Sequence, residues 1–200
     1  PVAMGPGSRV AIRGPQAHGT ARALLVQLAA SCGPADLRIV IVTDHPTAWD
    51  ALRGLPHLTM PDESCAIVPE AHLATVLAEL ERHQGHLLLV TDEPRLLATR
   101  TSALRRAVAD PDVHALLALL PAGDGVPHLC TAVLTTGTGP TARWVADTRV
   151  TMLPAAVRLT ALGERTAAAC AAALRGLVDP EDPLSVATGI PRQLSVVELP

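Results

Sequence analysis

The chain has 200 residues, of which 48% are hydrophobic; this is enough for one substantial folded domain and argues against a disordered chain. The formal net charge is -3 and only Trp49 and Trp144 are aromatic, so the sequence lacks the basic stripe and stacking side chains of a nucleic-acid-binding protein. Four cysteines lie far apart without a CxxC pair, which argues against a zinc site or a secreted disulfide framework and indicates reduced thiols.

All sixteen cationic residues are arginines, and the chain contains no lysine, asparagine, phenylalanine or tyrosine. Alanine and proline are abundant, so the bias is typical of a high-GC genome and we expect an actinobacterial source. No apolar run approaches the length of a membrane span, and no charged leader precedes an apolar segment. We therefore expect a cytoplasmic chain, either free or as the cytosolic part of a membrane-anchored protein, with no membrane contact by this segment.

The first 120 residues alternate between apolar strands and helices. Residues 37–43 and 86–91 are apolar runs rich in Leu, Ile and Val, as expected for strands that are buried on both faces. Between them, residues 70–84 show the apolar spacing of an amphipathic helix. This alternation predicts a doubly wound, mainly parallel α/β sheet. The predicted elements are strands at 9–13, 37–43, 86–91 and 113–120, and helices at 21–32, around Trp49, at 70–84 and at 102–109.

The character of the sequence changes after residue 126. Thr-rich alternating segments flank the turn at 137–140, which predicts a β-hairpin within residues 127–146. An Ala-rich helix is expected at 162–177, followed by a Pro-studded extended tail. We therefore expect one domain at residues 1–177 and a linker at 178–200.

The connection between the first strand and the first helix has the spacing of a phosphate-binding loop. Such a P-loop reads G-x-x-x-x-G-K-[ST]; its glycines let backbone N–H groups wrap a phosphate at a helix N-terminus, and its Lys and hydroxyl hold phosphate and magnesium. Gly14 and Gly19 occupy the two glycine positions, whereas Thr20 replaces the Lys and Ala21 replaces the Ser or Thr. The two glycines that shape the loop are kept, and the two residues that hold phosphate and magnesium are lost. An ordinary strand–helix turn explains the two glycines equally well.

Residues 87–93 (LLLVTDE) have the form of a Walker B strand, an apolar run that ends in an acid pair. In a working site the first acid supports magnesium and the second polarises the attacking water, and Asp92 and Glu93 fill these places. Acids also commonly end buried strands where solvent begins, so this alternative stays open. The broken Walker A pattern and the formed Walker B pattern together favour a degenerate P-loop domain.

Three segments resemble the FtsK/SpoIIIE-type ATPases, and especially the multi-ATPase EccC/EssC motor of type VII secretion. Residues 34–58, which end in an LPH turn, resemble the second core strand and the short helix after it; residues 87–97 resemble the Walker B strand; residues 161–177 resemble the helix that leads into an intermodule linker. The sequence departs from the family at the Walker A loop, and the polar sensor strand expected near 116–121 is apolar.

This resemblance implies a RecA/FtsK-like P-loop NTPase topology and a noncatalytic pseudo-ATPase module with a structural or regulatory role. The implied partners are adjacent ATPase modules of the same parent chain and other components of the secretion machinery, and a homo-oligomer is compatible with it. No cofactor is expected, and ATP with magnesium is the candidate if one binds. Nucleic acid is not expected as a partner.

Other chemistries are weaker matches. One alternative is a divergent NTPase, a DNA translocase or a secretion ATPase, in which Arg22 substitutes for the missing Lys; another is a domain that senses an anion at the same helix N-terminus. A receiver domain needs a Lys, and a Rossmann site needs a middle glycine that GPQAHG lacks. His18 lies in the loop, where we expect it to face solvent rather than to contact an anion. No histidine pair has metal-ligand spacing, and we expect no catalytic dyad between His128 and Cys130.

Overall fold

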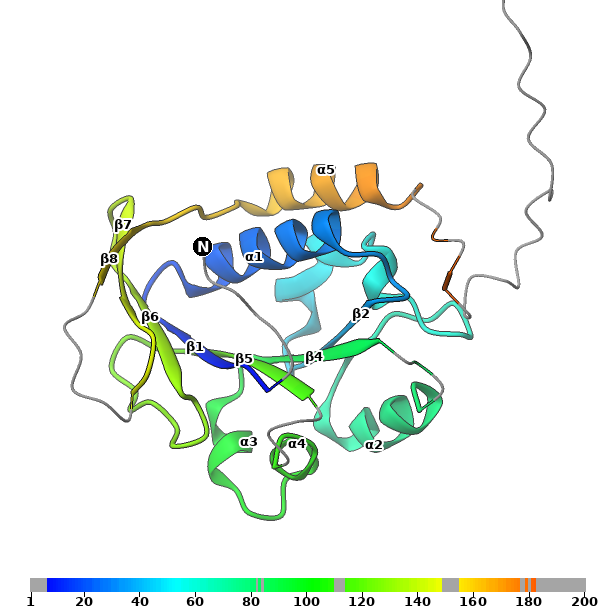
Figure 1. Cartoon of the computed structure of the whole chain (residues 1–200), viewed down its shortest axis with the longest axis horizontal. Coiled ribbons are helices and arrows are strands. Elements are labelled where there is room, and N and C mark those ends of the chain that lie inside the picture. Colours follow the sequence, from blue (N-terminus) through cyan, green and yellow to red (C-terminus); the bar gives the residue numbers. More distant parts are fainter. Residues whose placement is uncertain are drawn as a thin grey trace, which may run out of the picture.

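A twisted eight-stranded sheet forms the centre of the molecule, in the strand order β3-β2-β4-β5-β1-β6-β7-β8 (Figure 1). The computed structural model describes residues 7–81, 83, 85–109, 114–148, 155–176, 179 and 181–182. Strands β3 to β6 along this order run parallel, and β7 and β8 extend the sheet in antiparallel fashion. The strands are β1 (Arg9–Arg13), β2 (Leu37–Val42), β3 (Ile67–Val68), β4 (His86–Thr91), β5 (His114–Leu120), β6 (Ala132–Thr136), β7 (Thr141–Val145) and β8 (Ala155–Arg158).

Helices cover both faces of the sheet, with α1 and α5 on one side and α2, α3 and α4 on the other (Figure 1). The chain passes from β1 to β2 in one direction along the sheet and from β3 to β4 and β5 in the other, so right-handed crossovers place the helices on opposite faces. The helices are α1 (Ala17–Ser31), η1 (Pro46–Leu52), η2 (Pro56–Leu58), α2 (Glu70–Glu79), α3 (Pro94–Ala98), α4 (Ala103–Ala107) and α5 (Glu164–Leu174), where η1 and η2 are 3₁₀ helices.

This architecture confirms the predicted doubly wound, mainly parallel α/β sheet and the hairpin, which is formed by β6 and β7. The first helix begins at Ala17, four residues before the predicted start at 21, because the Ala17 N–H closes a turn onto the Gly14 carbonyl. The helix predicted at 70–84 is shorter and ends at Glu79. The sequence pattern missed α3 and the short edge strands β3 and β8. Most of the predicted linker, residues 183–200, lies outside the described residues, so the boundary at 177 stays a prediction.

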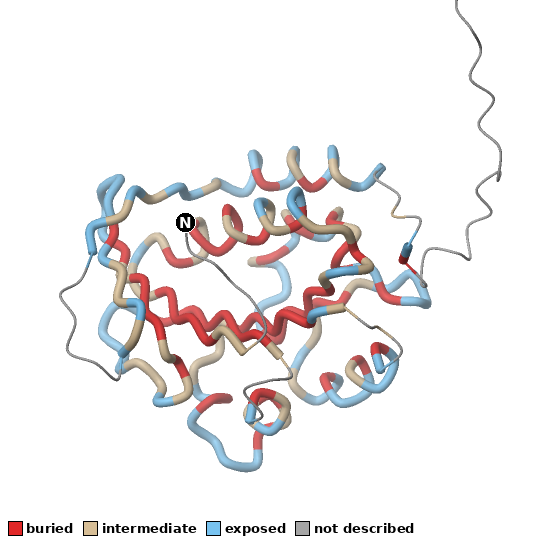
Figure 2. The backbone as a smooth tube through the Cα atoms, viewed as in Figure 1, coloured by how far each residue is buried: buried red, intermediate tan, exposed pale blue. Residues whose placement is uncertain are grey.

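The core consists of the central strands and the inner faces of the helices (Figure 2). Aliphatic side chains fill almost all of it, and Trp49 is its one fully buried aromatic residue among those described. Small alanines on α1, such as Ala17 and Ala21, let this helix lie close to the sheet. Close packing of small and branched side chains replaces the aromatic bulk that the sequence lacks.

A buried ion pair ties the residues after α5 to the sheet. Arg38 lies on β2 and its guanidinium donates to the carboxylate of Asp182, and both side chains are at most 5% exposed. The same guanidinium donates to the carbonyl of Pro56 within the LPH turn (3.1 Å) and to that of Thr59 just after it (2.7 Å). Nearby, the Asp179 carboxylate accepts the Ala35 N–H at 3.0 Å. A charge taken out of water needs such partners, so the fold depends on the residues that supply them.

Replacing Asp182 should therefore destabilise the domain strongly. We expect Asp182→Ala to lower the free energy of unfolding by about 3–5 kcal/mol, because it leaves the Arg38 charge buried without its counterion. The neighbouring Glu181 is exposed, so Glu181→Ala should change it by less than about 0.5 kcal/mol. Urea unfolding followed by far-UV circular dichroism measures both, and equal effects of the two substitutions would contradict the assignment.

Candidate functional site

The candidate site lies at the carboxyl ends of the central parallel strands, where ligands bind in open α/β sheets. Gly14 follows β1, Asp44 follows β2 by two residues, and Asp92 follows β4 directly. The fold thus brings the predicted loop and the predicted acid pair to the same edge of the sheet. Each predicted residue, however, is held in a specific contact with its own chain.

The loop after β1 is only three residues long, from Gly14 to Gln16. Gly14 has φ +119°, and a Cβ added there would lie 2.3 Å from the Thr136 carbonyl oxygen, so this position requires glycine for its backbone and for the close approach of β6. The Gln16 N–H donates to the Thr136 hydroxyl at 3.2 Å, and the Ala17 N–H donates to the Gly14 carbonyl at 3.1 Å. Two N–H groups near the place where a phosphate would bind are therefore already used.

The remaining motif residues lie within the first turns of α1 rather than in a loop. Gly19 is packed against the segment before α5: a Cβ there would lie 3.2 Å from the Cβ of Ala161, and the Gly19 carbonyl accepts the Leu162 N–H at 2.9 Å. The Thr20 hydroxyl donates to the Gln16 carbonyl at 2.8 Å. Ala21 is fully buried on the inner face of α1. Both glycines of the motif thus have a packing reason in this fold.

Asp92, at the Walker B position, is bound by two side chains from other elements. The Trp49 indole N–H donates to Asp92 Oδ2 at 2.9 Å, and His18 Nε2 lies 3.3 Å from the same oxygen. The His18 and Trp49 rings are in contact, with centroids 5.3 Å apart. The Asp92 side chain is only 7% exposed. The carboxylate therefore links the end of β4 to η1 and to the start of α1.

His18 differs from both interpretations of the sequence, because it neither faces solvent freely nor lies open to an anion. It sits on the first turn of α1, about half-buried against Trp49 and Asp92. Burial lowers its pKa below the ordinary value of 6.5, and the Asp92 charge opposes this shift. Neutral His18 with a proton on Nε2 donates to the Asp92 carboxylate.

Glu93 points to a surface cluster of charges rather than into the space above the loop. Its carboxylate lies 3.2 Å from Arg95 Nε and 3.8 Å from His45 Nε2, and Arg95 also pairs with Asp44. Arg95 and Asp44 are both largely exposed, so solvent screens this pair. The second acid of the pattern is thus part of a surface ion network.

Arg22, the candidate substitute for the missing Lys, is turned away from the loop. Its Nη2 donates to the Ala48 carbonyl at 2.9 Å and to Glu164 Oε1 at 3.0 Å, so it joins α1 to η1 and α5. The residue is 8% exposed. The Nη2 group of Arg22 is thus engaged by η1 and α5, while its Nε is buried without a hydrogen-bond partner.

The remaining candidate site residues, His57, Cys130 and His128, lie outside the cluster around Asp92. His57 of the LPH turn is buried and donates from Nε2 to the Cys32 carbonyl at 2.8 Å, which joins η2 to the end of α1. Cys130 is buried, and burial raises the pKa of its thiol to about 11, which disfavours a thiolate nucleophile, while His128 is exposed. Within the described ranges, no group of three or more His, Cys, Asp or Glu side chains is arranged to hold a metal ion.

Within the same ranges, no helix is long and apolar enough to cross a membrane.

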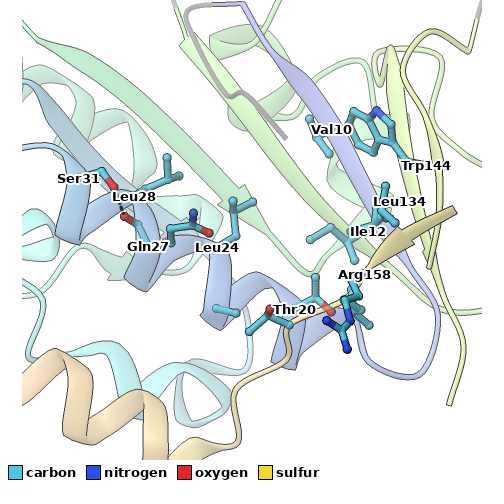
Figure 3. A pocket seen from close by; sticks show the side chains of 14 residues that line it. Val10, Ile12, Thr20, Leu24, Gln27, Leu28, Ser31, Leu134, Trp144 and Arg158 are labelled. Atoms are coloured by element: carbon cyan, nitrogen blue, oxygen red, sulfur yellow. Dashed lines mark hydrogen bonds between the residues drawn. The ribbon is translucent and has the colours of Figure 1, made fainter. Parts of the chain in front are cut away.

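An open, mainly apolar pocket of about 590 Å³ lies apart from this cluster, between α1 and the β6–β8 part of the sheet (Figure 3). Leu24 and Leu28 of α1 face Leu134 and Trp144 across it. Of the predicted site residues only Thr20 lines it. The pocket is therefore not the cavity of a nucleotide site.

The arrangement does not fit ATP with magnesium. A working site needs free loop N–H groups, a Lys, a hydroxyl for the metal and an acid open to it. Here the hydroxyl of Thr20 and the Oδ2 atom of Asp92 are engaged by the chain itself, and the Lys is absent. The sequence spacing could not reveal the contact of Trp49 with Asp92, because the two residues are 43 positions apart.

Comparison with solved structures finds similar folds, among them EccC and EssC. The EccC protein of Thermomonospora curvata (ATPases 2 and 3), solved with a signal sequence peptide, superposes with a TM-score of 0.54 at 14% identity, over 86% of this chain and 43% of that chain. EssC (ATPases 2 and 3) from Geobacillus thermodenitrificans superposes with a TM-score of 0.52 at 12% identity, over 95% of this chain and 48% of that one. This chain therefore has the fold of a P-loop ATPase domain and spans less than half the length of either structure. No protein-family model and no curated protein sequence matches it.

The role of Asp92 can be tested through stability. We expect Asp92→Ala to lower the free energy of unfolding by about 1–3 kcal/mol, because the buried Trp49 N–H loses its acceptor. The matched control is Asp44→Ala, another strand-end acid, whose exposed pair with Arg95 should be worth less than about 1 kcal/mol. Urea unfolding without nucleotide compares them. An unchanged stability of Asp92→Ala would show that the carboxylate is kept free for a ligand.

The buried histidines predict a loss of stability in mild acid. Burial lowers the pKa of His18, His57 and His83 below 6.5, so between their folded pKa values and 6.5 the unfolded chain binds more protons than the folded one. The stability that these groups contribute is fully present above pH 6.5 and is lost as the pH falls towards their folded pKa values. Urea midpoints at pH 7.5, 6.5 and 5.5 should fall in that order.

The control uses two histidine variants. His57→Gln should make the urea midpoint depend less on pH. His72→Gln, on the exposed face of α2, should leave the pH dependence of the midpoint as in the wild type. Midpoints that stay constant or rise on acidification would refute the prediction.

Proposed function

We propose that this chain is a noncatalytic ATPase-like module of a multi-domain translocation motor of the FtsK/SpoIIIE type, serving type VII protein secretion in a structural or regulatory role. The observation that carries the proposal is the position of the Asp92 carboxylate: Trp49 and His18 hold its Oδ2 atom, and its Oδ1 atom is buried without a hydrogen-bond partner. A carboxylate that is held and buried in this way fixes η1 and α1 on the sheet and is not open to a magnesium ion.

The loop supports the same conclusion. Its short length, the engaged N–H groups of Gln16 and Ala17, and the contact of Gly19 with Ala161 leave little room for the phosphates. The missing charge cannot be supplied by Arg22, which is bound to Ala48 and Glu164. Affinity for nucleotide should be weak or absent.

The proposed secretion role rests on the fold and on the resemblance of residues 34–58, 87–97 and 161–177. EccC and EssC were each solved as two ATPase units in one chain, and this chain spans about half of that length, as a single module does. The partners we propose are the adjacent modules of the same parent chain and other secretion components. Such a module would pack against active neighbours in the cytoplasm and transmit or restrain their motion.

Calorimetric titration with Mg-ATP tests the noncatalytic role. We expect no binding at concentrations up to about 1 mM, for the wild type and for Thr20→Lys, because a new charge alone does not free Asp92 or the loop N–H groups. Circular dichroism confirms that the variant is folded. Micromolar, magnesium-dependent binding by the wild type would establish a divergent NTPase, and binding of pyrophosphate without magnesium would establish an anion sensor.

The secretion role is tested separately by the parent gene. We expect it to encode intact Walker A and Walker B modules beside this one and a membrane segment before them. A parent gene that encodes this domain without any other ATPase module would contradict the proposed role in a translocation motor, whatever the outcome of the titration.

A further inference from the structure

The segment between β8 and α5 crosses directly over the start of α1. The Leu159 N–H donates to the Pro140 carbonyl at 2.8 Å at the end of β8, and the Leu162 N–H donates to the Gly19 carbonyl at 2.9 Å. A Cβ at Gly19 would come within 3.2 Å of Ala161. The chain thus covers the helix end at which a working P-loop meets its phosphates.

Helix α5 continues this segment along α1 and η1 and is held mainly by small side chains, together with the partly buried Leu162 before the helix and Leu174 at its end. Only Ala167 and Ala171 of its residues are fully buried, and the rest of the helix is partly or fully exposed (Figure 2). Helix α1, in contrast, buries side chains along its whole length, including Leu25. Because apolar stabilisation scales with the area buried, the contact of α5 is weak for a helix of this length.

One ion pair fastens the beginning of α5. Glu164 lies in the first turn of α5 and accepts from Arg22 Nη2 at 3.0 Å, and its side chain is 72% exposed while that of Arg22 is 10% exposed. Water reaches the carboxylate side of this pair, so it can break without leaving Glu164 unsolvated. Arg22 keeps its bond to the Ala48 carbonyl, and hence the position of η1, when Glu164 leaves.

Both ends of the segment are anchored more firmly than its middle. β8 holds the beginning through its pairing with β7. Asp179 and Asp182 hold the end through Ala35 and Arg38. A segment that is fixed at its ends, and rests between them on two buried alanines and two partly buried leucines, can open while the sheet stays folded.

We propose that residues 160–174 form a strap that opens and closes over the start of α1 as a cooperative unit of its own, with the Arg22–Glu164 ion pair as its catch. The open strap exposes the Gly19 backbone and the part of α1 that Ala161 and Leu162 cover when it is closed. The inference depends only on contacts within this chain and stands whether or not the chain serves secretion.

Hydrogen exchange of the full chain, resolved by residue with NMR, tests the strap. We expect amides of α5 and the Leu162 amide to exchange at least about 100-fold faster than amides of β4 and β5, since local opening costs less than global unfolding. Glu164→Gln should accelerate both by about 2- to 5-fold. Ala167→Glu, which puts a charge into the contact with α1, should accelerate them by more than about 10-fold and leave β4 within about twofold.

Matched controls lie beside each of these positions. Arg165→Gln and Ala168→Glu change exposed residues of the same helix and should leave the exchange of α5 within about twofold. Exchange of α5 at the rate of β4 in the wild type would overturn the proposal. So would a Leu162 amide that stays as slow as the core while α5 exchanges fast, because the helix would then fray without lifting from α1.

Discussion

The structure depends on how donors from the same chain hold the Asp92 carboxylate, whose Oδ2 atom accepts from them while its Oδ1 atom is buried without a hydrogen-bond partner. It stands at the end of a buried strand, almost inaccessible to water, and a charge in that place needs donors. The indole of Trp49 supplies one and the ring of His18 supplies another. Because these donors come from η1 and α1, the same contact fixes both elements on the sheet. The carboxyl end of β4 is thereby joined to the core.

Two glycines with P-loop spacing illustrate how a motif can persist for reasons of packing. Gly14 is required by its positive φ and by the closeness of Thr136, and Gly19 is favoured because a Cβ there would press against Ala161. Neither requirement involves a phosphate. The spacing therefore indicates the fold correctly, and the chemistry has to be judged from the side chains that the loop meets.

The sequence was sufficient to predict the architecture, because long apolar runs such as 37–43 and 86–91 have few other stable arrangements. It also placed Asp92 and the loop at one edge of the sheet, since parallel strands end on the same side. It could not reveal the partners of Asp92 or Arg22, which come from residues 43 and 142 positions away and depend on how η1 and α5 pack. The early start of α1 was missed because the glycine within it suggested a loop, whereas tertiary contacts favour the helix.

The Arg38–Asp182 pair gives the chain a defined point of mechanical attachment. A tension applied beyond residue 182 reaches Asp182 first, and the pair passes it across to β2, which lies between the edge strand β3 and β4 in the parallel part of the sheet. From Arg38 it also reaches the LPH turn, through the carbonyls of Pro56 and Thr59. Helix α5, which lies earlier in the chain, is shielded from that tension as long as the pair is intact. The domain thus receives a pull from its C-terminal side at a strand of its parallel sheet rather than at α5.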